Sequence, residues 1–244
     1  MTRDRDPVVG RKARTAMQDS IFANSEGNRW FARNQCALQA FDPADDMPLK
    51  LLDFYKLRPQ NALEIGAANG FRLAELQRRC GARVVAVELS RDAVEDGKAR
   101  FPLVTFVQAA ASAVPLQEVF DLVIINFVLH WIDRGNLLRT VAEIDRLVAD
   151  GGFLIIGDFY PSNRAQVPYH HLPVGMVQTY KQDYSGVFLS SGLYHPVCLM
   201  TAHLDHAAKT MDAEVVEEER IGTWLLRKQL HQHYVKAAMN GTHG

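Results

Sequence analysis

The stretch Leu63-Glu64-Ile65-Gly66-Ala67-Ala68-Asn69-Gly70 decides the fold of this chain. An apolar run enters it at Ala62, as expected of a buried strand, and an amphipathic pattern typical of a helix follows Gly70. Glycine adopts backbone dihedrals that strain other residues, and small neighbours let the backbone approach a ligand closely. The stretch therefore predicts a tight turn from strand to helix that borders a bound ligand.

Two carboxylates indicate which ligand this turn would hold. Glu88 ends the next apolar run, 18 residues after Gly70, where it can accept hydrogen bonds from the hydroxyls of a ribose. Glu64 stands two residues before the first glycine, where it would repel the pyrophosphate of a dinucleotide at the helix N-terminus. The ammonium and sulfonium groups of S-adenosylmethionine would instead be attracted. We therefore expect S-adenosylmethionine as the cofactor.

Short apolar runs alternate with amphipathic stretches after Pro59, which is the pattern of successive βα units on a parallel sheet. The predicted strands are Ala62–Ile65, Arg83–Val87, Val104–Val107, Phe120–Asn126 and Gly152–Gly157. The predicted helices are Phe71–Cys80, ended by Gly81, Arg91–Arg100, capped by Ser90, and Gly135–Val148. Two later β-like runs, Tyr194–Thr201 and Ile221–Arg227, would add an antiparallel pair to one edge. The expected fold class is α/β, with a doubly wound, mostly parallel sheet of seven strands and helices before it.

From Asn61 to Asp158 the sequence resembles the class I S-adenosylmethionine-dependent methyltransferases. The motifs that carry the resemblance are Glu64–Gly70, Val87-Glu88, Phe120-Asp121-Leu122-Val123 and Leu147–Ile155. The resemblance implies a Rossmann-like methyltransferase fold. It also implies an enzyme that methylates a small molecule, a sugar or a secondary-metabolite intermediate, and releases S-adenosyl-L-homocysteine.

The glycine turn, the two carboxylates and the resemblance together give a set of expected cofactor contacts. These residues are Glu64, Gly66, Ala67, Ala68, Gly70, Glu88, Leu89, Ala111, Ser112 and Asn126. Leu89 would pack on the adenine, and Asn126 would accept a hydrogen bond from the ammonium group. The family commonly has an acidic residue beside the adenine edge, whereas this loop reads Ala109-Ala110-Ala111-Ser112. We therefore expect backbone groups or the Ser112 hydroxyl to contact the adenine.

Three histidines are candidates for catalysis. His130 follows the fourth predicted strand, and imidazole titrates near neutral pH, so it could take a proton from a nucleophile. The alternative is that His130 and the next tryptophan pack the domain together. His170 and His171 lie in the connector after the fifth strand and could act in catalysis or bind the substrate. No third ligand stands at a suitable spacing, so we expect no metal.

Aromatic residues and one arginine are further candidates for binding. Tyr160, Tyr180 and Tyr184 are expected to contact the substrate, the last two from a predicted helix over Val174–Leu189, although such a helical stripe is also typical of a core. Trp30 and Arg33 could belong to a lid that binds the cofactor. The alternative places Trp30 in the core and Arg33 on the surface.

The expected domain organisation has three parts. Residues 1–18 mix charges with proline and glycine, as in a disordered tail. Residues 19–58 would form a cap of two or three helices with a break near Asp42 and Pro43, and residues 59–244 the methyltransferase domain, with a substrate-binding insertion at about 160–192.

Composition narrows the partners. The 244 residues include 27 Lys and Arg against 28 Asp and Glu, and a net charge of −1 argues against a nucleic-acid partner. No apolar run approaches the roughly 20 residues that cross a bilayer, so we expect no membrane partner and a cytoplasmic location, with a homodimer left open. Two alternatives to a methyltransferase stay open: a non-catalytic S-adenosylmethionine-binding module and an NAD-dependent oxidoreductase or epimerase.

Overall fold

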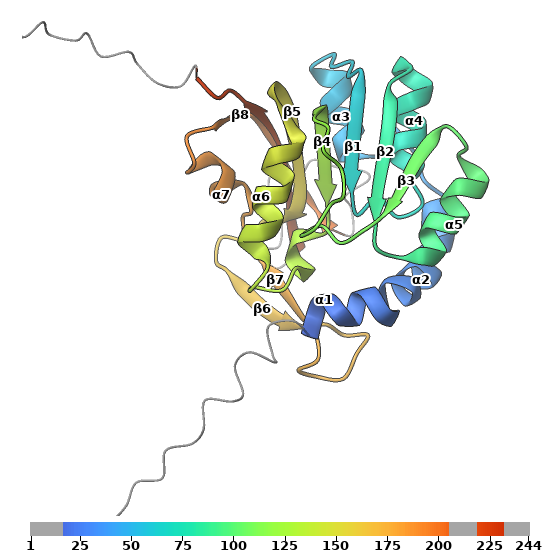
Figure 1. The fold of residues 1–244 in the computed structure, drawn as a ribbon. Helices are drawn as coiled ribbons and strands as arrows, with labels where there is room; N and C mark the ends of the chain where they lie inside the picture. Colours follow the sequence, from blue (N-terminus) through green and yellow to red (C-terminus); the bar gives the residue numbers. More distant parts are fainter. Residues whose placement is uncertain (1–16, 205–218, 232–244) are drawn as a thin grey trace, which may run out of the picture.

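The computed structural model describes residues 17–204 and 219–231, and its centre is a seven-stranded sheet in the order β3-β2-β1-β4-β5-β9-β8 (Figure 1). The strands of this sheet are β1 (Asn61–Ile65), β2 (Arg83–Glu88), β3 (Val104–Gln108), β4 (Phe120–Asn126), β5 (Val148–Phe159), β8 (Tyr194–His203) and β9 (Arg220–Lys228). β1 to β5 are parallel, β9 is antiparallel to β5, and β8 is antiparallel to β9. The predicted fold class is confirmed, including the antiparallel pair at one edge.

Local polar and glycine signals set the helix boundaries. α4 (Phe71–Cys80) and α5 (Arg91–Arg100) have the predicted bounds. α5 begins where the Ser90 hydroxyl accepts a hydrogen bond from the Ala93 N–H, and α4 ends at Gly81, whose φ of 69° is left-handed. α6 (Leu137–Leu147) begins two residues later than predicted. It ends one residue earlier, because Val148 already belongs to β5.

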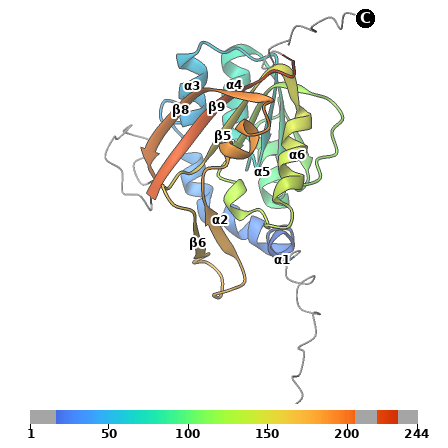
Figure 2. The same ribbon diagram turned by 90° about the vertical axis from the view of Figure 1, so that its left-hand side faces the viewer.

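Helices cover both faces of the sheet (Figures 1 and 2). α6 and the short α7 (Ser185–Leu189) pack on the face to which Leu63 and Ile65 point. α3 (Met47–Phe54) and α4 pack on the opposite face, together with Ala62. Neighbouring residues of β1 thus join different core clusters, as period-two alternation requires. Within the described ranges, no helix has the length and apolar character needed to span a membrane.

The N-terminal helices lie across the edge of the sheet at which the parallel strands end (Figure 1). They are α1 (Met17–Ile21), the π-helical turn η2 (Phe22–Glu26) and α2 (Gly27–Gln39). The break predicted near Asp42 and Pro43 falls between α2 and α3. Residues 1–16 of the predicted tail lie outside the described residues.

Of the helix predicted over Val174–Leu189, only the last five residues (α7) are helical, and a β-strand takes the place of its middle, so the prediction is wrong before Ser185. β6 (Ala165–Pro168) pairs antiparallel with β7 (Gln178–Lys181), and only α7 is helical. Within β7 only Thr179 is buried, and its neighbours are partly exposed. Tyr180 and Lys181 therefore lie on a strand, whose first residue, Gln178, accepts a hydrogen bond from Gln18 of the N-terminal helices.

Candidate active site

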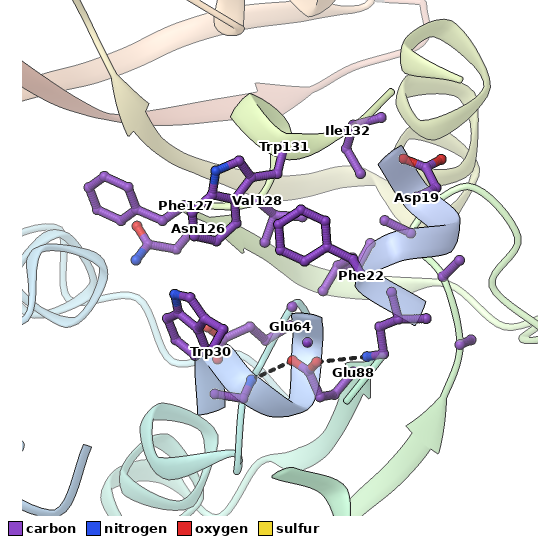
Figure 3. A pocket seen from close by; sticks show the side chains of 18 of the residues that line it. Asp19, Phe22, Trp30, Glu64, Glu88, Asn126, Phe127, Val128, Trp131 and Ile132 are labelled. Carbon is purple, nitrogen blue, oxygen red and sulfur yellow. Dashed lines mark hydrogen bonds between the residues drawn. The ribbon is translucent and has the colours of Figure 1, made fainter. Parts of the chain in front are cut away.

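A cavity of about 320 Å³ lies where the parallel strands end, beneath the N-terminal helices (Figure 3). It sits beyond the carboxyl ends of β1, β2 and β4, the usual place for a ligand in an open α/β sheet. The predicted cofactor residues that line it are Trp30, Glu64, Gly66, Ala68, Glu88, Leu89, Ala111, Ser112 and Asn126. Residues far apart in the sequence are thus brought to one concave site.

The turn after β1 depends on left-handed backbone at three positions: Gly66, Ala68 and Gly70 have φ values of 73°, 48° and 76°. The Gly66 N–H donates to the carbonyl oxygen of Val87 at 2.8 Å, which fixes the turn to β2. A Cβ at Gly66 would lie 2.2 Å from Val128 Cγ2. Glycine is therefore required at Gly66 by backbone conformation and by space.

Glu88 is held by backbone N–H groups from both sides. Its Oε2 accepts from Ala68 N at 2.8 Å, and its Oε1 accepts from Leu89 N at 2.8 Å and Ser90 N at 2.7 Å. Burial raises the pKa of Glu88, and the three N–H donors oppose that rise. A carboxylate has about four lone-pair positions, so one acceptor position on Oε2 remains for a ligand.

Glu64 is buried and belongs to an ion-pair network. Arg72, in the first turn of α4, pairs with Glu64 Oε1 and, at 2.8 Å, with Asp46 Oδ2. Glu64 Oε2 is buried and has no hydrogen-bond partner within the described residues. Burial raises the pKa of Glu64 to about 7, against the lowering effect of Arg72. Glu64, which lines the cavity, thus has one buried carboxylate oxygen without a hydrogen bond within the described residues.

The loop after β3 lines the cavity with small side chains. Ala109, Ala110, Ala111 and Ser112 all border it, and the Ala109 N–H donates to the Glu88 carbonyl oxygen at 3.1 Å. This hydrogen bond holds the loop against the end of β2. Only Ser112 brings a polar side chain to the cavity from this loop.

Aromatic rings form the opposite end of the cavity. Phe22 of η2 stacks on Trp131, with ring centroids 5.2 Å apart and an interplanar angle of 28°. Trp30 of α2 meets Trp131 edge-on at 6.4 Å, and Phe127 after β4 also lines this end (Figure 3). Phe22, Phe127 and Trp131 were not predicted as site residues. The positions of Phe127 and Trp131 just after the end of β4 could have indicated them.

Side-chain hydrogen bonds hold α1 over the cavity. The Gln18 amide donates to the carbonyl oxygens of Trp131 and Gln178 at 2.8 Å each. Asp19 Oδ1 accepts from Asp133 N at 2.8 Å, and its Oδ2 accepts from the Asn136 amide at 2.6 Å. Asp19 also lines the cavity, which the sequence did not predict.

Arg33 connects α2 to the hairpin and does not line the cavity. It pairs with the buried Glu26 and donates to the Tyr169 hydroxyl at 2.8 Å, while that hydroxyl donates to Glu26 Oε1 at 2.9 Å. Burial, reinforced by Glu26, raises the pKa of Tyr169.

Two other predicted cofactor residues, Ala67 and Gly70, also lie outside the cavity lining. Ala67 is packed in the core, and Gly70 faces Phe106.

His130 lies behind the cavity wall, in the 3-10 turn η3 (Leu129–Trp131). Only 2% of His130 is exposed, and its Nδ1 lies 2.9 Å from Asp158 Oδ1. The backbone N–H of His130 donates to Asp158 Oδ2 at 3.2 Å. The same carboxylate thus holds both the imidazole and the backbone of the turn that carries Trp131.

The other predicted catalytic and substrate residues do not line the cavity. His170 and His171 are exposed, with ring centroids 3.9 Å apart. Tyr184 is buried in the core, where its hydroxyl donates to the Tyr180 carbonyl oxygen at 2.6 Å. The Tyr180 ring lies 4.2 Å from the Arg134 guanidinium, and Tyr160 packs edge-on against Trp224. Across the described ranges, no cluster of three or more His, Cys, Asp or Glu could hold a metal ion.

Comparisons with known proteins agree with this geometry. Residues 63–156 match the family described as a methyltransferase domain. A probable S-adenosylmethionine-dependent methyltransferase of Mycobacterium tuberculosis is 23% identical over 208 residues, which cover 81% of this chain and 70% of the relative. A demethylmenaquinone methyltransferase of Renibacterium salmoninarum is 31% identical over 101 residues, 41% of each chain.

A solved structure supports the same fold. The 1,6-didemethyltoxoflavin-N1-methyltransferase of Burkholderia thailandensis, solved with S-adenosylhomocysteine, superposes with a TM-score of 0.65 at 19% identity and 93% coverage of both chains. The family match decides against the oxidoreductase or epimerase alternative. The chain is an S-adenosylmethionine-dependent methyltransferase, and S-adenosylmethionine is its methyl donor.

Proposed function

We propose that this enzyme methylates a small molecule, a sugar or a secondary-metabolite intermediate, inside the cavity beneath the N-terminal helices. The observation that carries this proposal is enclosure: α1 is hydrogen-bonded over the cavity through Gln18 and Asp19. A volume of about 320 Å³ suits a ligand of small-molecule size. A net charge of −1 is also unlike that of proteins that bind nucleic acid through phosphates.

Two carboxylates would hold the methyl donor at its polar ends. The remaining acceptor position on Glu88 Oε2 would accept a hydrogen bond from a ribose hydroxyl. The unpaired Oε2 of Glu64 would accept from the ammonium group of the methionine part, with the Asn126 amide as a second partner. This buried oxygen supports the assignment, because the ammonium group would supply the hydrogen bond that the oxygen lacks.

The adenine would lie against small and apolar residues. Leu89 and Ala111 line the cavity and can pack against a flat ring. The adjacent Ser112 would bring a hydroxyl that can hydrogen-bond to the adenine. Backbone groups of residues 109–112 would provide the remaining hydrogen bonds.

S-adenosylmethionine supplies, when bound, a methyl group on a positively charged sulfur. The protein's own contribution is to orient the acceptor, to exclude water and to keep the two reactants aligned, which can provide much of the acceleration. His130 is not placed to take a proton from the acceptor, because it lies outside the lining and is bonded to Asp158. We therefore propose that His130 positions η3 and Trp131.

The names of similar proteins are compatible with a small acceptor. They refer to a demethylmenaquinone, a didemethyltoxoflavin and a glycopeptide. These acceptors differ in structure, so they support the size class of the acceptor and not its identity.

Calorimetric titration with S-adenosylhomocysteine tests the assignment of the donor site. Glu88→Ala should weaken binding at least tenfold, because it removes the ribose acceptor and releases three N–H groups of the turn. Glu95→Ala is the matched control, since Glu95 is an exposed residue of α5 that pairs with Arg91. Unchanged affinity in Glu88→Ala would refute the ribose assignment.

Transfer of labelled methyl tests the acceptor class. The enzyme is incubated with labelled S-adenosylmethionine and a fractionated cell extract, and the label should enter the low-mass fraction. Label in the protein or RNA fraction alone would refute a small-molecule acceptor.

A further inference from the structure

The cavity has two chemically different ends. One side contains the glycine turn, Glu88 and the loop after β3, and the other contains the rings of Phe22, Phe127 and Trp131 (Figure 3). Trp30 lies on the side of Glu64 and Glu88, with its ring 6.4 Å from that of Trp131. Ring faces and edges favour contact with other flat π systems, in stacked or edge-to-face geometry. The second end therefore offers ring contacts to a ligand.

Few hydrogen-bonding groups are free at this aromatic end. The Trp131 indole N–H donates to the Thr179 hydroxyl at 3.1 Å, which also fixes the orientation of the ring. Asp19 already accepts hydrogen bonds from Asp133 N and from the Asn136 amide. The side chains of Asn126 and Trp30 line the cavity without a hydrogen bond to any described residue. One amide and one indole N–H are a small polar complement for a bound molecule.

We propose that the methyl acceptor is a flat aromatic or heteroaromatic molecule with few polar groups, bound against the rings of Phe22, Trp30 and Trp131. This inference rests on the proposed function and selects between its two acceptor classes. A sugar carries a hydroxyl on most of its carbons, and several of these would be buried without partners at this end of the cavity. A ring system with a single polar edge atom would match the indole N–H of Trp30, since the Asn126 amide is assigned to the ammonium group of the donor.

The aromatic contacts continue from the cavity to the surface of the protein. Tyr169 of the hairpin lies 5.3 Å from Trp131 and 6.0 Å from Phe22, measured between ring centroids. His171 is 5.3 Å from Tyr169, and both His171 and His170 are exposed. This row of rings follows the seam between η2 and the hairpin. The aromatic rings of the cavity are thus packed against the hairpin that carries the two histidines.

Binding to the full-length enzyme loaded with S-adenosylhomocysteine tests this proposal. The probes are lumazine, a flat heteroaromatic bicycle, and glucosamine, a polyhydroxylated amine, and their affinities are measured by calorimetry. We expect lumazine to bind at least tenfold more tightly than glucosamine. In a Trp224→Phe background, which leaves Trp30 and Trp131 as the tryptophans, lumazine should also quench the intrinsic fluorescence.

Variants of Phe22 locate the contact. Phe22→Leu keeps apolar volume but removes the ring, and it should weaken lumazine binding at least fivefold while the affinity for S-adenosylhomocysteine stays within twofold. Phe54→Leu is the matched control, because Phe54 is 77% exposed and lies on α3, away from the cavity lining.

Several outcomes would overturn the proposal. They are tighter or equal binding of glucosamine, no binding of lumazine by the loaded enzyme, and an unchanged lumazine affinity in Phe22→Leu. An equal loss of lumazine and S-adenosylhomocysteine affinity in that variant would also overturn it, because Phe22 would then only support the fold. Failure of the unmodified enzyme to bind S-adenosylhomocysteine would instead refute the proposed function, so the two failures are distinguishable.

Discussion

The two ends of the cavity are stabilised by different interactions. At the glycine end, hydrogen bonds of the backbone stabilise the turn. Gly66 N donates to the Val87 carbonyl oxygen, and the Glu88 carboxylate accepts from the backbone N–H groups of Ala68, Leu89 and Ser90. At the aromatic end, side chains from distant segments meet, as in the contacts of Phe22 with Trp131 and Tyr169. The first end depends on local backbone geometry and the second on tertiary packing, so substitutions should affect them differently.

The largest effect is expected from Gly66→Ala. The alanine would have to adopt a φ of 73°, and its Cβ would lie 2.2 Å from Val128 Cγ2. The β-branched side chain of Val128 has little rotamer freedom with which to move away. Left-handed backbone and overpacking together should lower the free energy of unfolding by about 2–5 kcal/mol. The affinity for S-adenosylhomocysteine should fall more than tenfold. Chemical denaturation and calorimetry would measure the two effects.

Gly151→Ala separates the two causes. Gly151 has a φ of 79°, but a Cβ there would meet nothing within 4 Å. We expect a loss of only about 1–2 kcal/mol, from the backbone alone, and no change in cofactor affinity. Equal losses in the two variants would show that crowding against Val128 does not matter.

The same distinction explains how far the sequence predicted the structure. The turn at Gly66, the cap at Ser90 and the strands β1 to β4 were predicted, because hydrophobic period and glycine act over a few residues. Most of the expected cofactor residues line the cavity for the same reason.

The part of the aromatic end that comes from η2 could not be predicted in this way. Phe22 becomes a cavity residue only because η2 packs against Trp131 of η3, a contact between residues far apart in the chain. The strand β7 was predicted as part of a helix, because four residues are too few for their hydrophobic pattern to distinguish a strand from a helix. His130 has the residue type of a base, but only the structure shows that it is buried against Asp158.

Variants of His130 test whether the aromatic end depends on positioning or on proton transfer. His130→Ala should lower the free energy of unfolding by about 2 kcal/mol, because it leaves the buried Asp158 without its partner. His130→Asn retains a donor near the position of Nδ1, so kcat should stay within a few fold and the pH profile should keep its shape. A catalytic base would instead cost about 10²–10⁴ in kcat in both variants. Steady-state kinetics across pH would measure the difference.

The affinity of the glycine end for S-adenosylhomocysteine should depend on pH through Glu64. Burial raises the pKa of Glu64 to about 7, and the ligand's ammonium group favours the ionised carboxylate, so binding releases a proton below that pH. We expect the affinity to rise roughly tenfold from pH 6 to 7.5. Because the pKa of Glu64 is higher in the folded state than in the unfolded state, the protonated carboxyl stabilises the fold at low pH. This contribution to the free energy of unfolding is lost as the pH rises from about 4.5 to 7.

Glu64→Gln is the control for this titration, measured by calorimetry at several pH values. It should bind more weakly and show a flat pH dependence. A slope that survives in Glu64→Gln would assign the titration to Glu88, because burial raises the pKa of that carboxyl as well. A flat profile in the unmodified enzyme would refute the contact between Glu64 and the ammonium group.

The smallest effect is expected at Ser90, which connects the two ends. Its hydroxyl accepts from the Ala93 N–H and donates to Asn28 Oδ1 of α2 at 2.8 Å, while its backbone N–H donates to Glu88. Ser90→Ala removes the helix cap and the contact with α2, and should cost about 1 kcal/mol of unfolding free energy. Because the backbone donor to Glu88 remains, the affinity for S-adenosylhomocysteine should change less than twofold. A larger loss of affinity would show that the glycine end depends on the N-terminal helices, and the separation between the two ends would then fail.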